Sequence, residues 1–202
     1  MNLNGTTQEL EKEINSLYPE VRRVLGKNKH IKAQMLPYQA MVLYGLAKSY
    51  NREDSYILEI GTAAGFSASI IAQAAPKAKI VTLNSAHHEI EIAQKNLKKR
   101  KNVIVIEAVS WDYLAHYIGP YLDMIFVDGD HRQVKRDMAW FNWLKVGGLM
   151  LFHDYSILSS HIVYETVNKF AGDLKRMLDV VIVDADKVGM AGLYRQNGEY
   201  YR

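Results

Sequence analysis

The 202-residue sequence contains no cysteine at all. Disulfide bonds, cysteine nucleophiles and cysteine-ligated metal sites are therefore excluded. It also lacks any apolar run near the ~18 residues that a membrane-spanning helix needs, and its polar first residues are unlike a signal peptide. Its net charge is only +3, which by itself does not predict nucleic-acid binding. We therefore expect a soluble, cytoplasmic protein without a membrane or nucleic-acid partner.

From residue 56 onward, the sequence alternates regularly between two kinds of segment. Short runs suited to buried strands lie at Tyr56–Ile60, Lys79–Leu83, Val103–Glu107, Met124–Val127 and Leu149–Phe152. Segments suited to helices lie between them, at Phe66–Ala74, His88–Lys99, Trp111–His116 and Arg132–Trp143. Strands that alternate with helices of ~10 residues indicate a doubly wound α/β fold, with a mostly parallel sheet and helices on both faces.

The pattern changes near the C-terminus. A predicted helix over Ser160–Phe170 is followed by strand candidates at Met177–Asp184 and Gly189–Arg195, with only residues 185–188 between them. Such a short connection permits a hairpin but no helical crossover. We therefore expect a sheet of seven strands in which the last strand runs antiparallel.

The residues before the first strand are also predicted to form helices. A capping box at Thr6–Glu9 opens one helix, a short helix spans Pro19–Gly26, and a third spans Pro37–Ser49. We divide the chain into an N-terminal helical extension, residues 1–35, and a single domain, residues 36–202. The extension could cover a ligand cleft or form the contact of a homodimer, and the sequence does not choose between them.

A glycine turn directly follows the first predicted strand. A pyrophosphate-binding loop needs the spacing G-x-G-x-x-G, but Ala63 and Phe66 stand where its second and third glycines would be. The sequence instead reads E-x-G-x-A-x-G, from Glu59 through Gly61 to Gly65. A carboxylate beside such a turn suits a positively charged ligand, and S-adenosylmethionine carries an ammonium and a sulfonium group but no phosphate. We therefore favour it over NAD; the alternative is a structural turn in which Glu59 is satisfied internally.

Acidic and histidine side chains follow the fourth and fifth predicted strands. The motif D-G-D-H, Asp128–His131, follows the fourth strand, and His153 and Asp154 follow the fifth. Ligands of α/β proteins bind at this carboxyl edge of the sheet. If the two strands are neighbours, Asp128 and Asp154 face one cleft, where they either raise one another's pKa or share a cation. The alternative is that both carboxylates cap helices and orient a cofactor.

Three segments together carry a resemblance to a known family. They read ILEIGTAAGFSASIIA, DMIFVDGDHRQVKRDM and LKVGGLMLFHDYS. The chain resembles the class I S-adenosylmethionine-dependent methyltransferases, and within them the small bacterial O-methyltransferases whose fourth strand ends in a D-G-D-H motif. The similarity covers roughly Leu36 to Arg195. It implies a Rossmann-like sheet of seven strands with an antiparallel last strand, in agreement with the hairpin predicted above.

The resemblance also implies where the cofactor binds. Carried over position by position, the residues that hold it are Glu59, Gly61, Ala63, Gly65, Ser67, Asn84, Ser110, Trp111 and Asp128. The loop after the first strand would hold the methionine end, Asn84 the ribose, and Ser110 and Trp111 the adenine. The chain departs from the family at Asn84, where an acid usually binds the ribose hydroxyls, and at Val109, where an Asp often lies near the adenine.

Catalytic and metal-binding residues are implied in the same way. Metal-dependent relatives of the catechol type bind Mg²⁺ or Ca²⁺ through acids at the positions of Asp128 and Asp154, and have an Asn where this chain has Tyr155. His131 stands where those relatives place a lysine base, and His153 or water molecules could complete the metal's ligands. A bound ion would lower the pKa of an acceptor hydroxyl. Without a metal, a histidine is the natural base, so the catalytic candidates are His131, Asp128 and His153.

The function implied is transfer of a methyl group from S-adenosylmethionine to a small hydroxylated acceptor, such as a sugar, a phenol or a secondary metabolite. Methylation of RNA or protein is an alternative, although the weak net charge and the lack of a basic, aromatic surface stripe count against RNA. A different alternative is a non-catalytic protein that binds S-adenosylmethionine, which the substitutions at Asn84 and Val109 make plausible.

Overall fold

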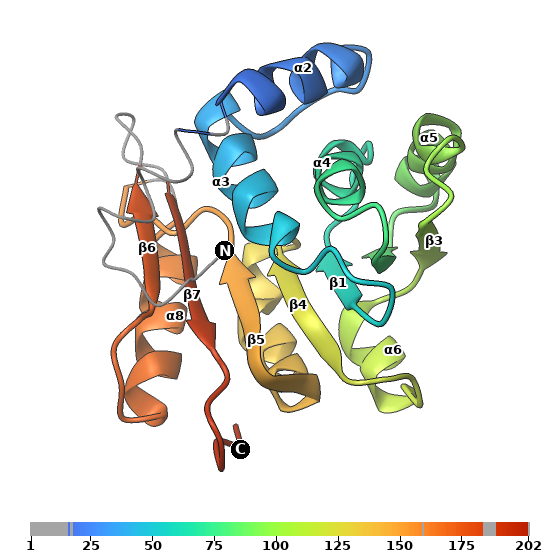
Figure 1. The fold of residues 1–202 in the computed structure, drawn as a ribbon. Helices are drawn as coiled ribbons and strands as arrows, with labels where there is room; N and C mark the ends of the chain where they lie inside the picture. Colours follow the sequence, from blue (N-terminus) through green and yellow to red (C-terminus); the bar gives the residue numbers. More distant parts are fainter. Residues whose placement is uncertain (1–15, 17, 159, 184–188, 202) are drawn as a thin grey trace.

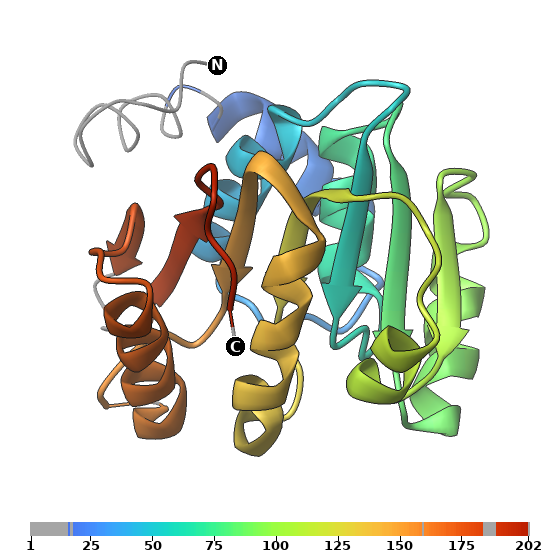
Figure 2. The ribbon, with the colours of Figure 1, turned by 90° about the horizontal axis from the view of Figure 1, so that it is seen from below.

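A seven-stranded sheet lies between two layers of helices in the computed structural model, which describes residues 16, 18–158, 160–183 and 189–201 (Figures 1 and 2). The strands are β1 (Tyr56–Ile60), β2 (Lys79–Asn84), β3 (Val103–Glu107), β4 (Leu122–Val127), β5 (Leu144–Phe152), β6 (Val180–Val183) and β7 (Gly189–Tyr194). The α-helices are α2 (Tyr18–Asn28), α3 (Pro37–Lys48), α4 (Phe66–Ala74), α5 (His87–Leu97), α6 (Ser110–Ala115), α7 (Val134–Asp137) and α8 (His161–Asp173). The 3₁₀ helices η1 (His131–Gln133) and η2 (Met138–Trp143) flank α7.

The direction of each strand agrees with the sequence prediction. Across the sheet the order is β3-β2-β1-β4-β5-β7-β6, and the pairs among the first five strands of this order are parallel. Strand β7 runs antiparallel to both β5 and β6, where Ala191 is the partner of Phe152 on one side and of Val181 on the other. The predicted seven-stranded, doubly wound α/β fold with an antiparallel last strand is confirmed.

Strand β5 is longer than predicted. It begins at Leu144, five residues before the predicted start at Leu149. The prediction stopped at Gly147 and Gly148 because glycine pairs usually mark a turn. Here Gly148 lies so close to the backbone that an added Cβ would be 3.0 Å from the carbonyl oxygen of Asp123. The glycines therefore let the strand continue through an irregularity in its pairing with β4.

The segment predicted as one helix over Arg132–Trp143 is divided instead into η1, α7 and η2. In a 3₁₀ helix, side chains three residues apart lie in line with one another. Met138 and Phe141 have this spacing in η2 and are both buried, as is Trp140 between them. The need to bury these large side chains against the sheet accounts for the tighter winding.

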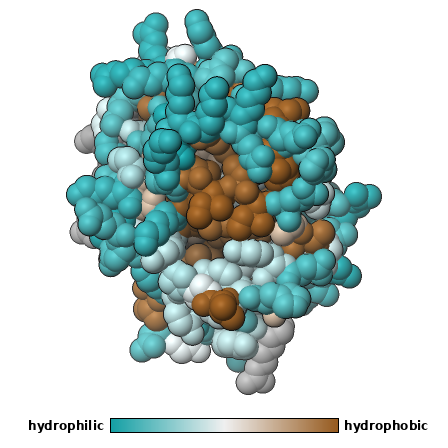
Figure 3. Space-filling model, turned by 90° about the vertical axis from the view of Figure 1, so that its right-hand side faces the viewer, coloured by the Kyte–Doolittle hydropathy of each residue, from teal (hydrophilic) through white to brown (hydrophobic). Residues whose placement is uncertain are grey.

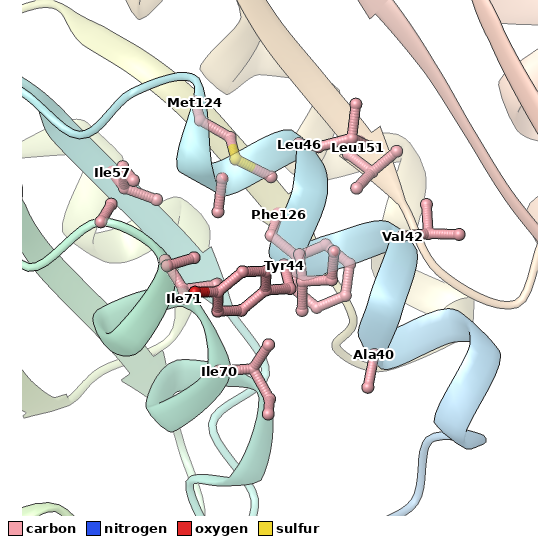
Figure 4. Packing of buried hydrophobic residues seen from close by; sticks show 14 of the residues in the cluster. Ala40, Val42, Tyr44, Leu46, Ile57, Ile70, Ile71, Met124, Phe126 and Leu151 are labelled. Carbon is pink, nitrogen blue, oxygen red and sulfur yellow. The ribbon is translucent and has the colours of Figure 1, made fainter. Parts of the chain in front are cut away.

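Each face of the sheet has its own hydrophobic core, because successive side chains of a strand point to opposite faces. On one face, Ile57, Phe126 and Leu151 pack with residues of α3 and α4 (Figure 4). On the other face, the core joins sheet residues to η2 and α8 and includes Leu58, Ile125, Val127, Phe152, Phe141 and Phe170. Every residue of β4 is buried, as expected for a central strand that helices cover on both faces.

Helix α2 packs on α3 at the N-terminal side of the fold (Figure 1). Val21 and Val24 are buried in the same core as α3. The Tyr44 hydroxyl donates to a carboxylate oxygen of Glu20 at 2.6 Å, and the Lys48 ammonium lies 2.5 Å from the other oxygen. The helix predicted over Pro19–Gly26 is confirmed, whereas the one predicted to open at Thr6 lies outside the described residues.

The side of the molecule formed by the edge strand β3 carries a hollow of hydrophobic residues (Figure 3). A cavity of about 270 Å³ lies there between the sheet and the α6–β4 connection, and its apolar lining includes Ile57, Ile80, Val81, Ile104, Tyr113, Tyr117, Pro120 and Leu122. This cavity is at the amino ends of the strands, opposite to the edge where ligands of such folds bind. In the part of the chain that is described, no helix combines the length and the apolar character needed to cross a membrane.

Candidate functional site

The carboxyl edge of the sheet brings the predicted motifs together. Strand β1 lies between β2 and β4, so the chain winds in opposite directions on its two sides, and a crevice opens at such a switch point. The Asp128 amide donates to the Ile60 carbonyl at 2.8 Å, and the His153 amide to the Val127 carbonyl at 3.0 Å. These bonds hold the ends of β1, β4 and β5 side by side.

The turn after β1 requires glycine at one position above all. Gly61 has a φ of +103°, and an added Cβ would be only 2.1 Å from the carbonyl oxygen of Asp128. Gly65, with a φ of +85°, is the N-cap of α4, and its amide closes a turn onto the Thr62 carbonyl at 2.7 Å. Ala63 also has a positive φ, of 43°. The loop thus curls tightly against the end of β4, as the small residues of the E-x-G-x-A-x-G motif predict.

Glu59 lies behind this loop and is fully buried. One carboxylate oxygen accepts a short hydrogen bond from the Thr82 hydroxyl, and the other oxygen, Oε1, has no hydrogen-bond partner. Burial raises the pKa of Glu59 to about 8, and neighbouring hydroxyl groups offset this only in part. Its side chain lines none of the cavities at this edge, so the direct contact with a cofactor that we predicted stays a prediction.

A first cavity, of about 170 Å³, is formed by the ends of β1–β4, the start of α6 and the η1–α7 segment. Its lining residues include Gly61, Asn84, Ser110, Trp111, Gly129, Asp130, Gln133 and Asp137. The three residues predicted at the ribose and adenine therefore line one cavity. The structure adds Gln133 and Asp137, which follow the D-G-D-H motif closely in the sequence but were given no role there.

The three predicted residues in this wall already have partners. The Asn84 amide donates to a carboxylate oxygen of Glu89 at 2.7 Å, so an acid lies directly beside the position where the family usually has one. The Ser110 hydroxyl accepts a hydrogen bond from the Trp140 indole at 2.9 Å. Trp111 is covered by the Arg136 guanidinium, which lies 4.7 Å from its ring centroid.

A second, smaller cavity of about 30 Å³ lies on the other side of the glycine turn, and Gly61 lines both cavities. It is lined by Ala63, Ser67 and Asp128, three of the residues predicted to hold the cofactor, together with Lys32 and other residues of the segment before α3. The sequence left open whether the N-terminal extension covers a cleft. In the structure, its last residues do contribute to this wall.

Asp128, His153 and Asp154 form a cluster at the ends of β4 and β5. His153 Nδ1 lies 3.0 Å from Asp128 Oδ1 and 3.2 Å from Asp154 Oδ2, although neither contact has the direction of a hydrogen bond. Its other ring nitrogen, Nε2, lies 3.1 Å from Gln39 Oε1. Among the described residues, these three supply ligand atoms that all lie within 4.8 Å of one another and could hold a metal ion.

His131 joins the cluster from its outer side. Its Nε2 lies 3.0 Å from Asp154 Oδ2, and its Nδ1 lies 3.0 Å from the Ser160 hydroxyl. Asp154 itself has a φ of 55°, an uncommon backbone conformation for a residue other than glycine. Tyr155 points elsewhere, because its hydroxyl bonds to the Asn168 side chain at 3.0–3.1 Å. The structure therefore brings together all the predicted catalytic and metal-binding residues.

The charges of this cluster are strongly coupled. Burial raises the pKa of Asp128, and the neighbouring His153 offsets this only in part. Burial would lower the pKa of His153, but the two carboxylates outweigh it and raise that pKa to about 10. Burial also works to raise the pKa of Asp154, but His153 and His131 together hold it below its usual value. A positive charge is thus favoured between the two carboxylates.

Comparison with known proteins points to a methyltransferase domain. Residues 58–155, just under half of the chain, match the sequence profile of a family described as a methyltransferase domain. The chain contains a methyltransferase domain. A catechol O-methyltransferase from Niastella koreensis is 28% identical to it over 155 residues, which cover 70% of each chain.

Solved structures of O-methyltransferases share the fold of this methyltransferase. One is the Bacillus cereus O-methyltransferase in complex with SAH, with a TM-score of 0.66 and 18% identity over 87% of this chain and 90% of that one. Another is TomG from Streptomyces achromogenes, involved in tomaymycin synthesis and in complex with SAM, with a TM-score of 0.67 and 18% identity over 88% of each chain. These structures confirm the predicted Rossmann-like fold, and the matched domain supports the predicted methyltransferase, while the roles of individual residues stay predictions.

Proposed function

We propose that this methyltransferase transfers a methyl group from S-adenosylmethionine to an oxygen atom of a small hydroxylated acceptor. The observation that carries the proposal is the position of Asp128, which lines the cavity beside the glycine turn and also belongs to the cluster with His153 and Asp154. A cofactor held by the turn would therefore present its methyl group next to groups that can bind or deprotonate a hydroxyl.

In this proposal, the two cavities bind different parts of the cofactor. The adenosine end occupies the first cavity, with Ser110 and Trp111 at the adenine and Asn84, supported by Glu89, at the ribose. The methionine end lies along the turn from Gly61 to Ser67. The buried carboxylate behind the turn favours a cationic ligand over an anionic one, because a nearby positive charge stabilises its ionised form.

The residues present fit a divalent metal ion. In an octahedral site with bonds of ~2.1 Å, adjacent ligand atoms lie about 3.0 Å apart. His153 Nδ1 stands at about that separation from Asp128 and Asp154 and lacks a directed hydrogen bond, while Nε2 contacts Gln39 Oε1, which can only accept a hydrogen bond. That contact fixes the tautomer in which Nδ1 carries the lone pair.

His153 would thus supply the third ligand. It would replace the Asn that metal-dependent relatives have at the position of Tyr155. Because one ligand is an imidazole nitrogen, ions such as Mn²⁺ suit the site better than Mg²⁺ or Ca²⁺, which prefer oxygen alone. A bound ion would lower the pKa of an acceptor hydroxyl. The side chains themselves hold the acceptor in line with the methyl group and take up its proton.

His131 is the residue that we propose holds this proton. If Nε2 donates to Asp154, Nδ1 accepts from the Ser160 hydroxyl. A hydroxyl can donate or accept, so Nδ1 can gain a proton while Ser160 rotates and keeps the contact. His131 is also partly exposed, with 40% of its side chain accessible, and an acceptor can therefore reach it.

The decisive experiment is calorimetric titration with S-adenosylmethionine, with and without Mn²⁺, followed by a transfer assay with methyl-labelled cofactor. The relative named a catechol O-methyltransferase makes aromatic diols the first acceptors to test, with simple phenols and sugars beside them. We expect binding, and methylation of at least one hydroxylated acceptor. Absence of cofactor binding under all conditions would overturn the proposal, and binding without transfer would favour a non-catalytic protein.

A further inference from the structure

Asp137 is a buried acid to which the sequence motifs gave no role. It lies in the wall of the first cavity and also lines a smaller cavity beside Asp128, His131 and His153. It is the last residue of α7 and is only 2% exposed. Its side-chain neighbour is the Ser110 hydroxyl, and one carboxylate oxygen, Oδ1, has no hydrogen-bond partner. An unpaired buried acceptor costs free energy, so a ligand that donates a hydrogen bond there is favoured.

Among the described residues, the rest of the wall offers no other buried side-chain acceptor that lacks a hydrogen-bond partner. Of the described polar side chains that line the cavity, only Ser110 and Asp137 are buried, and Asp137 Oδ1 is the one buried side-chain atom among them without a hydrogen-bond partner. Asn84 is held by Glu89, and position 109 is a valine. Ser110 accepts from Trp140, which leaves its own proton for Asp137.

Resting on the proposed function, we propose that the Asp137 carboxylate accepts a hydrogen bond from the exocyclic amino group of adenine and so selects an adenine-containing cofactor. The amino group is the donor that distinguishes adenine from hypoxanthine, which carries a carbonyl oxygen there. A carboxylate facing that oxygen would be repelled and left unpaired. Sites built to bind an N–H group discriminate strongly against analogues that lack it.

The test compares the binding of S-adenosylhomocysteine and S-inosylhomocysteine by calorimetry at pH 8. Burial raises the pKa of Asp137 to about 6, so the side chain is ionised under these conditions. We expect the wild-type protein to prefer the adenosyl compound by about 10- to 100-fold, as for a hydrogen bond to a charged group. In Asp137→Ala this preference falls at least tenfold, mainly through weaker binding of the adenosyl compound.

Asp137→Asn provides a nearly isosteric second variant. Its amide oxygen can keep the Ser110 hydroxyl as donor, which directs the amide NH₂ group to the base and reverses the preference towards the inosyl compound. A merely structural role would not reverse it. Asp112→Ala removes an exposed carboxylate of α6 that does not line the cavity, and it is the control that keeps the wild-type ratio.

An unchanged ratio in both Asp137 variants, with melting temperatures that show them to be folded, overturns the inference and leaves the proposed function intact. Equal binding of the two compounds by the wild-type protein overturns it as well. Failure of the wild-type protein to bind either compound overturns both the inference and the proposed function. The first two results overturn the inference alone.

Discussion

The two halves of the site hold their carboxylates in opposite ways. On the cofactor side, Glu59 and Asp137 are buried without a cationic partner, and burial raises their pKa values to about 8 and about 6. On the catalytic side, Asp128 and Asp154 share His153 between them. In the first half, one oxygen of each carboxylate therefore lacks a donor, and a ligand can bring a positive or hydrogen-donating group to it. The second half already contains such a group in His153, whose proton an ion could replace.

The largest expected effect comes from the glycine that joins the two halves. In Gly61→Ala, the new Cβ would meet the Asp128 carbonyl at 2.1 Å, in a backbone conformation that alanine rarely adopts. We expect a loss of roughly 3 kcal/mol or more in the free energy of unfolding, measured with urea, together with loss of cofactor binding. Gly147→Ala is the control, since Gly147 has a φ of +80° but open space around it, and should cost only about 1–2 kcal/mol.

Removing one carboxylate tests whether the catalytic half binds an ion. At a Mn²⁺ concentration 100 times its dissociation constant, the ion should stabilise the wild-type protein by about 2.7 kcal/mol, and Asp154→Ala should abolish the accompanying rise in melting temperature. Asp130→Ala removes an exposed carboxylate that pairs with Arg132 and should keep the rise. An equal rise in Asp154→Ala would exclude Asp154 as a ligand.

The pH dependence of stability tests the cofactor half. Because the folded pKa of Glu59, about 8, lies above its unfolded value, the folded state holds this proton more tightly. Its contribution to stability is complete below the unfolded pKa and is lost as pH rises through about 8, at up to about 1.4 kcal/mol per pH unit. Glu59→Gln should remove this slope in urea unfolding between pH 5 and 8. The exposed Glu53→Gln should keep it, and identical slopes in all three proteins would show that Glu59 does not titrate in this range.

The same comparison shows what the sequence could predict. The turn from Gly61 to Gly65 and the D-G-D-H motif could be located because each is a contiguous stretch at a strand end, where the fold alone sets its position. Lys32 and Ser160 could not be assigned to the site, because they reach it from other elements through tertiary packing and belong to no local pattern. Asp137 lies close to the D-G-D-H motif, but the sequence did not show that its side chain is buried in the cavity wall. The hydrogen bond from Thr82 to Glu59 could not be predicted either, because the two residues lie on different strands.

The smallest expected effect concerns the hydroxyl that holds His131 from the outside. Ser160 contacts His131 Nδ1, but its side chain makes no capping bond to α8, so Ser160→Ala should leave the stability of the fold nearly unchanged. Loss of one neutral hydrogen bond, about 0.5–1.5 kcal/mol, predicts a fall of less than about tenfold in kcat, with little change in KM. The pH profile of kcat should shift as well, because the protonated ring loses an acceptor. Ser85→Ala, in the wall of the first cavity, should leave that profile unchanged. A Ser160 variant with wild-type kcat and pH profile would show that His131 does not take up the proton at Nδ1, and would leave His153 as the histidine to test.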